Sequence, residues 1–302
     1  MKKWMILSAV ILAIALLAFR PLQLFHKYYL TPCAADGPEK QDDFEMHLEE
    51  VDLEAYYESL DQFGDEFDVQ VINKVSYKEK TYPIYQIDSV NEESQNRLLL
   101  FAATHGNEFA SALVIPELLR EIGENEMYQS WDIRIVTPIN PVGLDYKSRY
   151  NEHGCDINRD FKNFQTLGAQ IQKDAIQEFN PDIIVSLHEG PQKGFFAIGT
   201  ASVSSELESL MLSELQSEGV QMASKSFLGL PLAKDGLMHE GFVITTAKKI
   251  FGIHTLGRYG ESQGVGVITT ESSWFDTDVQ NRIKPHMVVV ETVVNEYGKT
   301  AP

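Results

Sequence analysis

The sequence has few cysteines and few basic residues, and each shortage excludes a class of protein. Its 302 residues include only two cysteines, Cys33 and Cys155, which is too few for a disulfide-stapled scaffold. One bridge between them is possible in an oxidising compartment, but Cys33 lies in a predicted linker, so we interpret Cys155 as a small packing residue. Basic residues number 25 against 44 acidic ones, giving a net charge of −19. This charge repels phosphate backbones and argues against a nucleic-acid partner.

Long apolar runs are also scarce, and the N-terminal one is short for a membrane span. Two lysines precede the uncharged run from Trp4 to Phe19, which Arg20 and Pro21 close. No cleavage site of small residues follows directly. We therefore predict an uncleaved transmembrane anchor over residues 1–25, giving a single-pass cell-membrane protein with the rest of the chain outside. The alternative is a cleaved signal segment and a secreted protein. An acidic linker over residues 26–50 follows.

Strand and helix patterns alternate over residues 51–302, and the 43% hydrophobic content is enough for a sizeable core. Asp52 is a plausible N-cap for a short helix. The expected strands are 69–77 and 82–88, which form a β-hairpin, then 97–104, 133–137, 182–187 and 265–270. The expected helices are 109–122, 167–179, 204–218 and 278–297. This order predicts an α/β domain with a mixed, largely parallel central sheet and helices on both faces.

Chemically active side chains stand where three of the predicted strands end. His105 and Glu108 follow the strand 97–104, His188 follows the strand 182–187, and Glu271 follows the strand 265–270. The carboxyl ends of parallel strands share one edge of a sheet, so we expect these groups to converge. Two imidazoles and a carboxylate form a three-ligand zinc site with an open position, which is typical of a catalytic metal.

A loop between the ligands carries two arginines and an asparagine, namely Arg149, Asn158 and Arg159. Planar guanidinium groups bind carboxylates bidentately or polarise a carbonyl. On a surface such a segment is usually a salt-bridge cluster, but beside a metal site it indicates recognition of a substrate carboxylate.

These motifs, in this order, closely resemble the zinc carboxypeptidases, the M14 metallocarboxypeptidases. The matching pieces are His105-Gly-Asn-Glu108, Asp156-Ile-Asn158-Arg159-Asp160-Phe161, His188 and Thr270-Glu271. The resemblance covers residues 56–297. It implies a carboxypeptidase-like fold and one zinc ion held by His105, Glu108 and His188. It also implies that Glu271 is the general base, that Arg149 polarises the scissile carbonyl, and that Asn158 and Arg159 bind the free carboxylate of the substrate.

The expected function is a zinc-dependent metallocarboxypeptidase acting outside the membrane on peptides, which include the stem peptides of peptidoglycan. A zinc deacylase similar to aspartoacylase and succinylglutamate desuccinylase is the main alternative, because those enzymes resemble carboxypeptidases in their ligands and Asn-Arg pair. A peptide-binding pseudoenzyme is the other. Carboxypeptidases often cover the substrate with a tyrosine from a mobile loop; Tyr259 is the nearest candidate, but its distance from Glu271 fits poorly.

Overall fold

Eight strands form one mixed sheet in a computed structural model, which describes residues 25–33, 36–38, 51–89, 96–226, 231–239 and 248–300, together with residues 23, 91, 94, 229 and 246. The strand order is β1-β2-β4-β3-β5-β8-β6-β7. The strands are β1 (Asp68–Tyr77), β2 (Lys80–Ser89), β3 (Asn96–Phe101), β4 (Trp131–Thr137), β5 (Ile183–Gly190), β6 (Phe196–Gly199), β7 (Leu237–His239) and β8 (Gly266–Ser273).

The centre of the sheet is parallel and its flanks are mixed. Strands β4, β3, β5 and β8 run parallel to one another. The hairpin β1–β2 adds antiparallel pairs on one side, and β6 pairs antiparallel with β8 on the other. The predicted mixed, largely parallel sheet with an opening hairpin is therefore confirmed.

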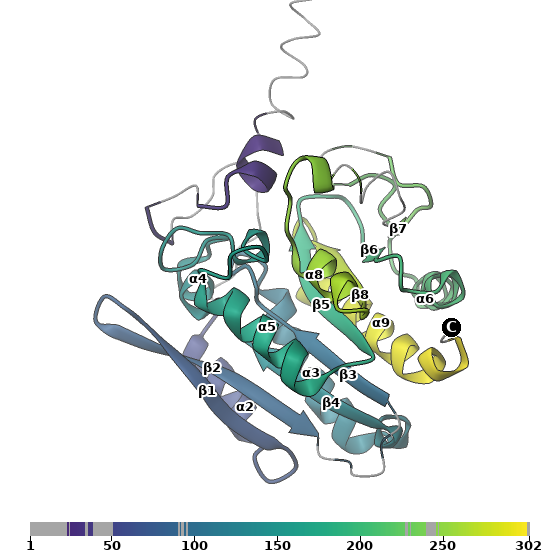
Figure 1. The fold of residues 1–302 in the computed structure, drawn as a ribbon. Helices are drawn as coiled ribbons and strands as arrows, with labels where there is room; N and C mark the ends of the chain where they lie inside the picture. The colour runs from purple at the N-terminus through teal and green to yellow at the C-terminus, as the bar shows by residue number, and fades with distance from the viewer. Residues whose placement is uncertain are drawn as a thin grey trace, which may run out of the picture.

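Helices cover both faces of this sheet (Figure 1). The helices are α2 (Leu53–Asp61), α3 (Ala110–Glu124), α4 (Pro141–Tyr146), α5 (Leu167–Phe179), α6 (Ser205–Ser217), α8 (Leu256–Ser262) and α9 (Val279–Thr300). Shorter turns are η1 (His26–Leu30), η2 (Glu126–Ser130) and η3 (Ile157–Arg159). The side chain of Asp52 accepts hydrogen bonds from the backbone N–H groups of Glu54 and Ala55, so the predicted N-cap of α2 is confirmed.

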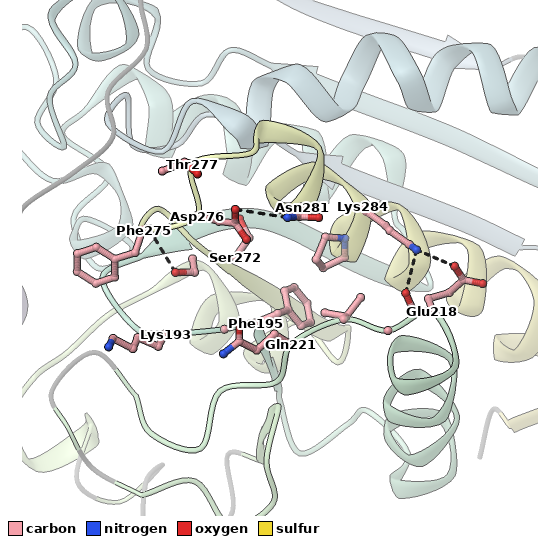
Figure 2. A pocket seen from close by; sticks show the side chains of 15 residues that line it. Lys193, Phe195, Glu218, Gln221, Ser272, Phe275, Asp276, Thr277, Asn281 and Lys284 are labelled. Carbon is pink, nitrogen blue, oxygen red and sulfur yellow. Dashed lines mark hydrogen bonds and ion pairs between the residues drawn. The ribbon is translucent and has the colours of Figure 1, made fainter.

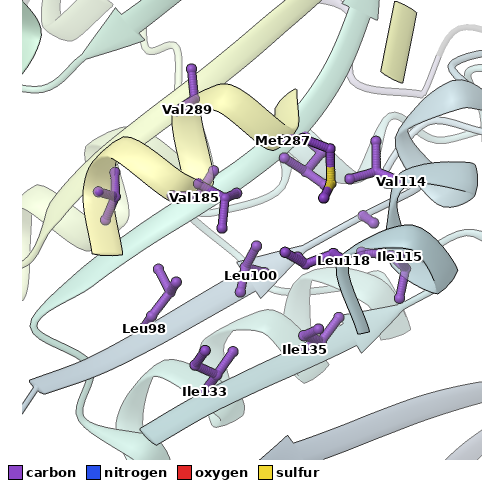
Figure 3. Close-up of a cluster of buried hydrophobic side chains, with 14 of the residues drawn as sticks. Leu98, Leu100, Val114, Ile115, Leu118, Ile133, Ile135, Val185, Met287 and Val289 are labelled. Atoms are coloured by element: carbon purple, nitrogen blue, oxygen red, sulfur yellow. The ribbon is translucent and has the colours of Figure 1, made fainter. Parts of the chain in front are cut away.

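The core has two layers because strand side chains alternate between faces. Leu98 and Leu100 of β3 pack with α3 and α9 on one face, as Figure 3 shows. Leu99 and Phe101 face the opposite layer, which contains side chains of α5 and α8. All four are fully buried, and each contributes about 1.5–3 kcal/mol of hydrophobic stabilisation. The central strands are consequently rigid supports for the residues that follow them.

Two sequence predictions require correction here. No helix among the described residues has the length and apolar character needed to cross a membrane. This finding contradicts the single-pass membrane location; the apolar run is shorter than the roughly 20 residues that a spanning helix needs. The predicted anchor itself, residues 1–25, lies almost entirely outside the described residues.

The second correction concerns the cysteines, which form a disulfide bond between Cys33 and Cys155. The prediction that Cys155 is a packing residue was therefore wrong. Residues 26–33, part of the predicted linker, fold back onto the domain: the backbone carbonyl of Pro32 accepts a hydrogen bond from the N–H of Asp156 at 2.6 Å. Sequence spacing carries no signal for such a contact, since 122 positions separate the two cysteines.

Candidate active site

The predicted site residues meet at the point where the sheet topology changes direction. From β3 the chain crosses to β4 on one side and then returns to β5 on the other. In open α/β sheets, ligands bind at such a switch point, beyond the carboxyl ends of the strands. His105 follows β3 and His188 lies at the end of β5, where it is paired with Glu271 of the neighbouring β8.

The turn after β3 has an unusual backbone that places His105. Strand β3 ends at Phe101, earlier than predicted, because Ala103 has a positive φ of 53° and redirects the chain. Gly106 packs directly against the backbone of Gly143 in α4, so a Cβ at this position would overlap that backbone. The Gly in His105-Gly-Asn-Glu108 therefore permits a close approach that no other residue allows.

The three predicted metal ligands form a buried cluster. Nδ1 of His105 lies 2.7 Å from Oε1 of Glu108, and Nδ1 of His188 lies 2.7 Å from Oε2 of the same carboxylate. One ligand atom from each residue lies within 4.8 Å of the others. Each of the three residues is 2% exposed. Within the described part of the chain, no other set of three His, Cys, Asp or Glu residues converges in this way.

The donor set fits a divalent metal such as zinc. Burial raises the pKa of Glu108, but His105 and His188 outweigh burial and hold it well below its usual range. Burial also lowers the pKa of His188. An ionised carboxylate and a neutral imidazole are the protonation states that bind zinc. Nε2 of His188 is one of the buried atoms of the described residues that has no hydrogen-bond partner.

Asp156 contacts His105 through the imidazole nitrogen that does not face Glu108. Its Oδ1 lies 3.0 Å from Nε2 of His105, while its Oδ2 lies 2.8 Å from the guanidinium of Arg149. Burial raises the pKa of Asp156, but Arg149 and His105 outweigh it and keep the carboxyl ionised. A carboxylate on the outer nitrogen of a ligating histidine fixes the tautomer and raises its basicity as a ligand. In the sequence, Asp156 is recognisable only as part of the motif around Asn158 and Arg159, although ligating histidines commonly have such a partner.

Glu271 lines the same cavity as the three ligands. Burial and the nearby Glu108 raise its pKa well above the usual range, while Arg149 and Arg159 oppose the shift. A carboxyl with a raised pKa can take up and return a proton near neutral pH. The position of Glu271 beside His188 is thus compatible with the predicted role of general base.

Both predicted arginines and the asparagine also line this cavity. Arg149 lies 3.3 Å from Oε1 of Glu108, next to the ligand cluster. Oδ1 of Asn158 accepts a hydrogen bond from the N–H of Leu256, so its amide nitrogen is the group that can donate to a carboxylate. Nε of Arg159 donates to the backbone carbonyl of Tyr28, which the sequence analysis did not connect with the site.

The cavity has a volume of about 370 Å³ and a largely apolar wall. Phe196, Ile198, Phe251 and Trp274 are part of that wall. Tyr259, the candidate for a covering tyrosine, instead packs against Phe161 and Phe164 and does not line the cavity. The tyrosines that do line it are Tyr28 and Tyr29, from residues far upstream.

A larger cavity of about 580 Å³ lies beside α9, and Figure 2 shows its lining. Two of its charged groups are engaged with each other, since Lys284 pairs with Glu218 at 2.9 Å. The described residues that line it include no ligand cluster of the kind found near His105. Ser272 lines this cavity whereas its neighbour Glu271 lines the smaller one. The candidate metal ligands and the candidate general base therefore line the smaller cavity.

Comparison with known proteins connects this geometry with hydrolases. The family model of the succinylglutamate desuccinylase/aspartoacylase catalytic domain matches residues 94–192. Carboxypeptidase 2 from Trichophyton rubrum is 26% identical over 151 residues, and its counterpart from Trichophyton tonsurans is 25% identical over 174 residues. These matches support a zinc carboxypeptidase-type family. They cover 46% and 52% of this chain, but only 27% and 31% of the fungal proteins, so the chain spans less than a third of their length.

Solved structures show the same fold. A candidate metallopeptidase from Shewanella amazonensis SB2B superposes with a TM-score of 0.67 at 17% identity, over 87% of this chain and 98% of that one. A metallo-carboxypeptidase from Pseudomonas aeruginosa superposes with a TM-score of 0.60 at 12% identity, over 82% of this chain and 69% of that one. The predicted carboxypeptidase-like architecture is therefore confirmed.

Proposed function

We propose that this protein is a zinc-dependent carboxypeptidase that hydrolyses the amide bond next to a free terminal carboxylate. The observation that carries the proposal is the convergence of His105, Glu108 and His188 in one cavity with Glu271 and Arg159. An ion held by the first three residues would act as a Lewis acid and activate water for attack on the amide carbonyl.

The surrounding side chains supply proton transfer, orientation and charge. Glu271 takes a proton from the attacking water and returns it to the leaving amine, for which its raised pKa suits it. Arg149, fixed by Asp156, offers positive charge to the developing oxyanion. Asn158 and Arg159 bind the terminal carboxylate and thereby align the bond to be cut.

A zinc deacylase acting on N-acyl amino acids is the second candidate. It is favoured by the family match over residues 94–192, which is to a desuccinylase and aspartoacylase domain. Such substrates also present a carboxylate beside an amide, so the same residues would serve. The two candidates differ in what lies on the acyl side of the bond: a peptide chain or a small acid.

The deciding experiment is metal analysis and product mass spectrometry on the purified full-length protein. Substrates are peptides with free or amidated C-termini, muropeptides, N-acetylaspartate and N-succinylglutamate. We expect about one zinc per chain and release of a terminal residue from the free peptides but not the amidated ones. Cleavage of muropeptides alone would narrow the substrate class to cell-wall peptides. Cleavage of N-acyl amino acids alone would overturn the carboxypeptidase proposal in favour of the deacylase.

The variant Glu271→Gln tests the catalytic mechanism. It keeps the size of the side chain but removes the base, so we expect kcat to fall by a factor of about 10² or more, while metal content and substrate affinity stay near those of the wild type. Unchanged turnover would exclude Glu271 as the base. A wild-type protein that binds peptides without cutting them would instead identify a binding module.

A further inference from the structure

A segment close to the N-terminus forms part of the cavity. We name residues 25–33 the N-terminal strap. It contains the turn η1 and lies at the same end of the molecule as the loop between α4 and α5 (Figure 1). Phe25, Tyr28 and Tyr29 of the strap line the cavity together with the ligands and Glu271. Tyr28 is only 6% exposed, so the strap is packed against the domain.

The strap contacts both arginines of the site. The backbone carbonyl of Tyr28 accepts a hydrogen bond from Nε of Arg159 at 2.6 Å, and the Tyr29 ring lies 4.7 Å from the same guanidinium. The Tyr28 ring lies 5.4 Å from the guanidinium of Arg149. A ring against the guanidinium plane and an acceptor at Nε together fix its orientation.

The fixed Arg159 retains donors for a ligand. NH1 also donates to the backbone carbonyl of Asn158 at 2.7 Å. Each terminal nitrogen of a guanidinium carries two hydrogens, so the strap and Asn158 together use only two of its five. The strap therefore orients the group and leaves hydrogens for a carboxylate.

The strap is attached at the loop that holds the site. The disulfide joins Cys33 to Cys155, and the neighbouring Pro32 carbonyl accepts from the N–H of Asp156. Asp156 in turn contacts both His105 and Arg149. One covalent bond and one backbone hydrogen bond thus connect the strap directly to the residues that surround the candidate metal site.

We propose that the N-terminal strap positions Arg159 for carboxylate binding, and that this positioning depends on the Cys33–Cys155 bridge. The inference rests on the proposed role of Arg159 as the carboxylate-binding group. Tyr28 and Tyr29 are positioning residues in this view. Without the bridge the strap separates more readily from the cavity, and Arg159 loses both its Nε acceptor and its stacked ring.

The test compares the full-length wild type with the double variant Cys33→Ser/Cys155→Ser and with Tyr29→Leu, which keeps apolar bulk but removes the ring. For a peptide with a free C-terminus, we expect KM to rise about tenfold in the double variant and a few-fold in Tyr29→Leu. We expect kcat and metal content to change less than about threefold. Leu30→Ala is the matched control, because this exposed side chain lies on the same turn. Peptide mapping of the non-reduced wild type must show the bridge, and free thiols would overturn the proposal.

Two results of the kinetic measurements would also overturn the proposal that the strap positions Arg159. An unchanged KM in the double variant would mean that the strap does not position Arg159. A lower KM with a higher kcat/KM would mean that the strap blocks the cavity. Reductants that bind zinc are avoided, since the serine variants remove the bridge without disturbing the metal.

A second measurement separates this proposal from the proposed function. Phenylglyoxal modifies accessible arginines, and peptide mass spectrometry reports its rate at Arg159. We expect at least fivefold faster modification in the double variant than in the wild type. A wild type that does not discriminate free from amidated peptides would refute the proposed function, whereas equal modification rates would refute the strap.

Discussion

At the scale of single residues, the site depends on carboxylates that have different tasks because their surroundings differ. Glu108 lies between two imidazoles, which hold its pKa low although burial raises it. Glu271 is only partly exposed and has Glu108 as a neighbour, and burial together with this second carboxylate raises its pKa. One carboxylate is thereby kept ionised as a ligand, and the other can exchange a proton.

Asp156 gives the first prediction at this scale. Asp156→Asn keeps the shape but removes the charge that supports His105 and Arg149. We expect zinc affinity to fall about 10–100-fold, as for other partners of ligating histidines, measured by competition with a chromogenic chelator. Asp174→Asn, on an exposed part of α5, is the control and leaves affinity unchanged. Equal affinities for Asp156→Asn and the wild type would mean that His105 needs no such support.

At the scale of elements, a buried ion pair joins α9 to β5 directly behind the ligands. The guanidinium of Arg282 donates to both oxygens of Glu189, at 2.6 and 2.9 Å, and both side chains are almost fully buried. Glu189 also accepts from the N–H of Ala110 at the start of α3. Because Glu189 follows His188, this pair connects two helices to the strand that carries a ligand.

Breaking that pair leaves a buried charge without its partner. We expect Arg282→Met to lower the free energy of unfolding by about 3–5 kcal/mol, measured by urea denaturation of the metal-loaded protein. Lys299→Met is the matched control on the same helix, because its pair with Glu296 is exposed and such pairs contribute about 1 kcal/mol or less. Similar losses for the two variants would contradict the assignment of Arg282 as a core element.

The same scale explains which elements could be predicted. The strands that precede His105, His188 and Glu271 are continuous apolar runs, and their alternation with helices predicts that they run parallel. Strands β6 and β7 span only Phe196–Gly199 and Leu237–His239. Such short segments have too little periodicity to be recognised in the sequence. In the structure β6 pairs with β8, and β7 pairs with β6.

More of the candidate site could be predicted from the sequence than of the segments that surround it. His105, Glu108, His188, Arg149, Asn158, Arg159 and Glu271 all line one cavity. The strap could not be predicted, because Tyr28 reaches Arg159 across 131 positions through a backbone carbonyl, which every residue type possesses. Tyr259 was considered from its nearness in sequence to Glu271, yet helix α8 directs it into an aromatic cluster instead.

At the scale of the whole molecule, the fold buries a polar network that limits stability in acid. His286 of α9 is fully buried; its Nδ1 lies 2.7 Å from Oγ1 of Thr270 and its Nε2 lies 3.0 Å from Oγ of Ser272. Burial, reinforced by the neighbouring His188 and Arg282, lowers the pKa of His286 to about 3. The folded chain therefore keeps this imidazole neutral where the unfolded chain, with a pKa near 6.5, takes up a proton.

The sign of the pH dependence follows from proton binding. Between pH values of about 6.5 and 3, the unfolded state binds more protons at this position, so the free energy of unfolding falls as pH falls. The slope from one group approaches about 1.4 kcal/mol per pH unit. We expect His286→Gln to lack this contribution, so that its stability declines less steeply than that of the wild type from pH 6.5 downwards.

Urea denaturation at successive pH values measures how the free energy of unfolding depends on pH in each protein. The slopes of the two curves are compared and not their absolute values, because the substitution also perturbs the core. The metal ligands titrate in both proteins, so their contribution to the slope cancels when the two proteins are compared. His153→Gln is the control substitution, because the His153 side chain is 77% exposed. Parallel curves for the wild type and His286→Gln would mean that His286 takes up a proton as readily in the folded protein as in the unfolded chain. In that case both of its hydroxyl partners, Thr270 and Ser272, would have to accept hydrogen bonds from a charged imidazolium.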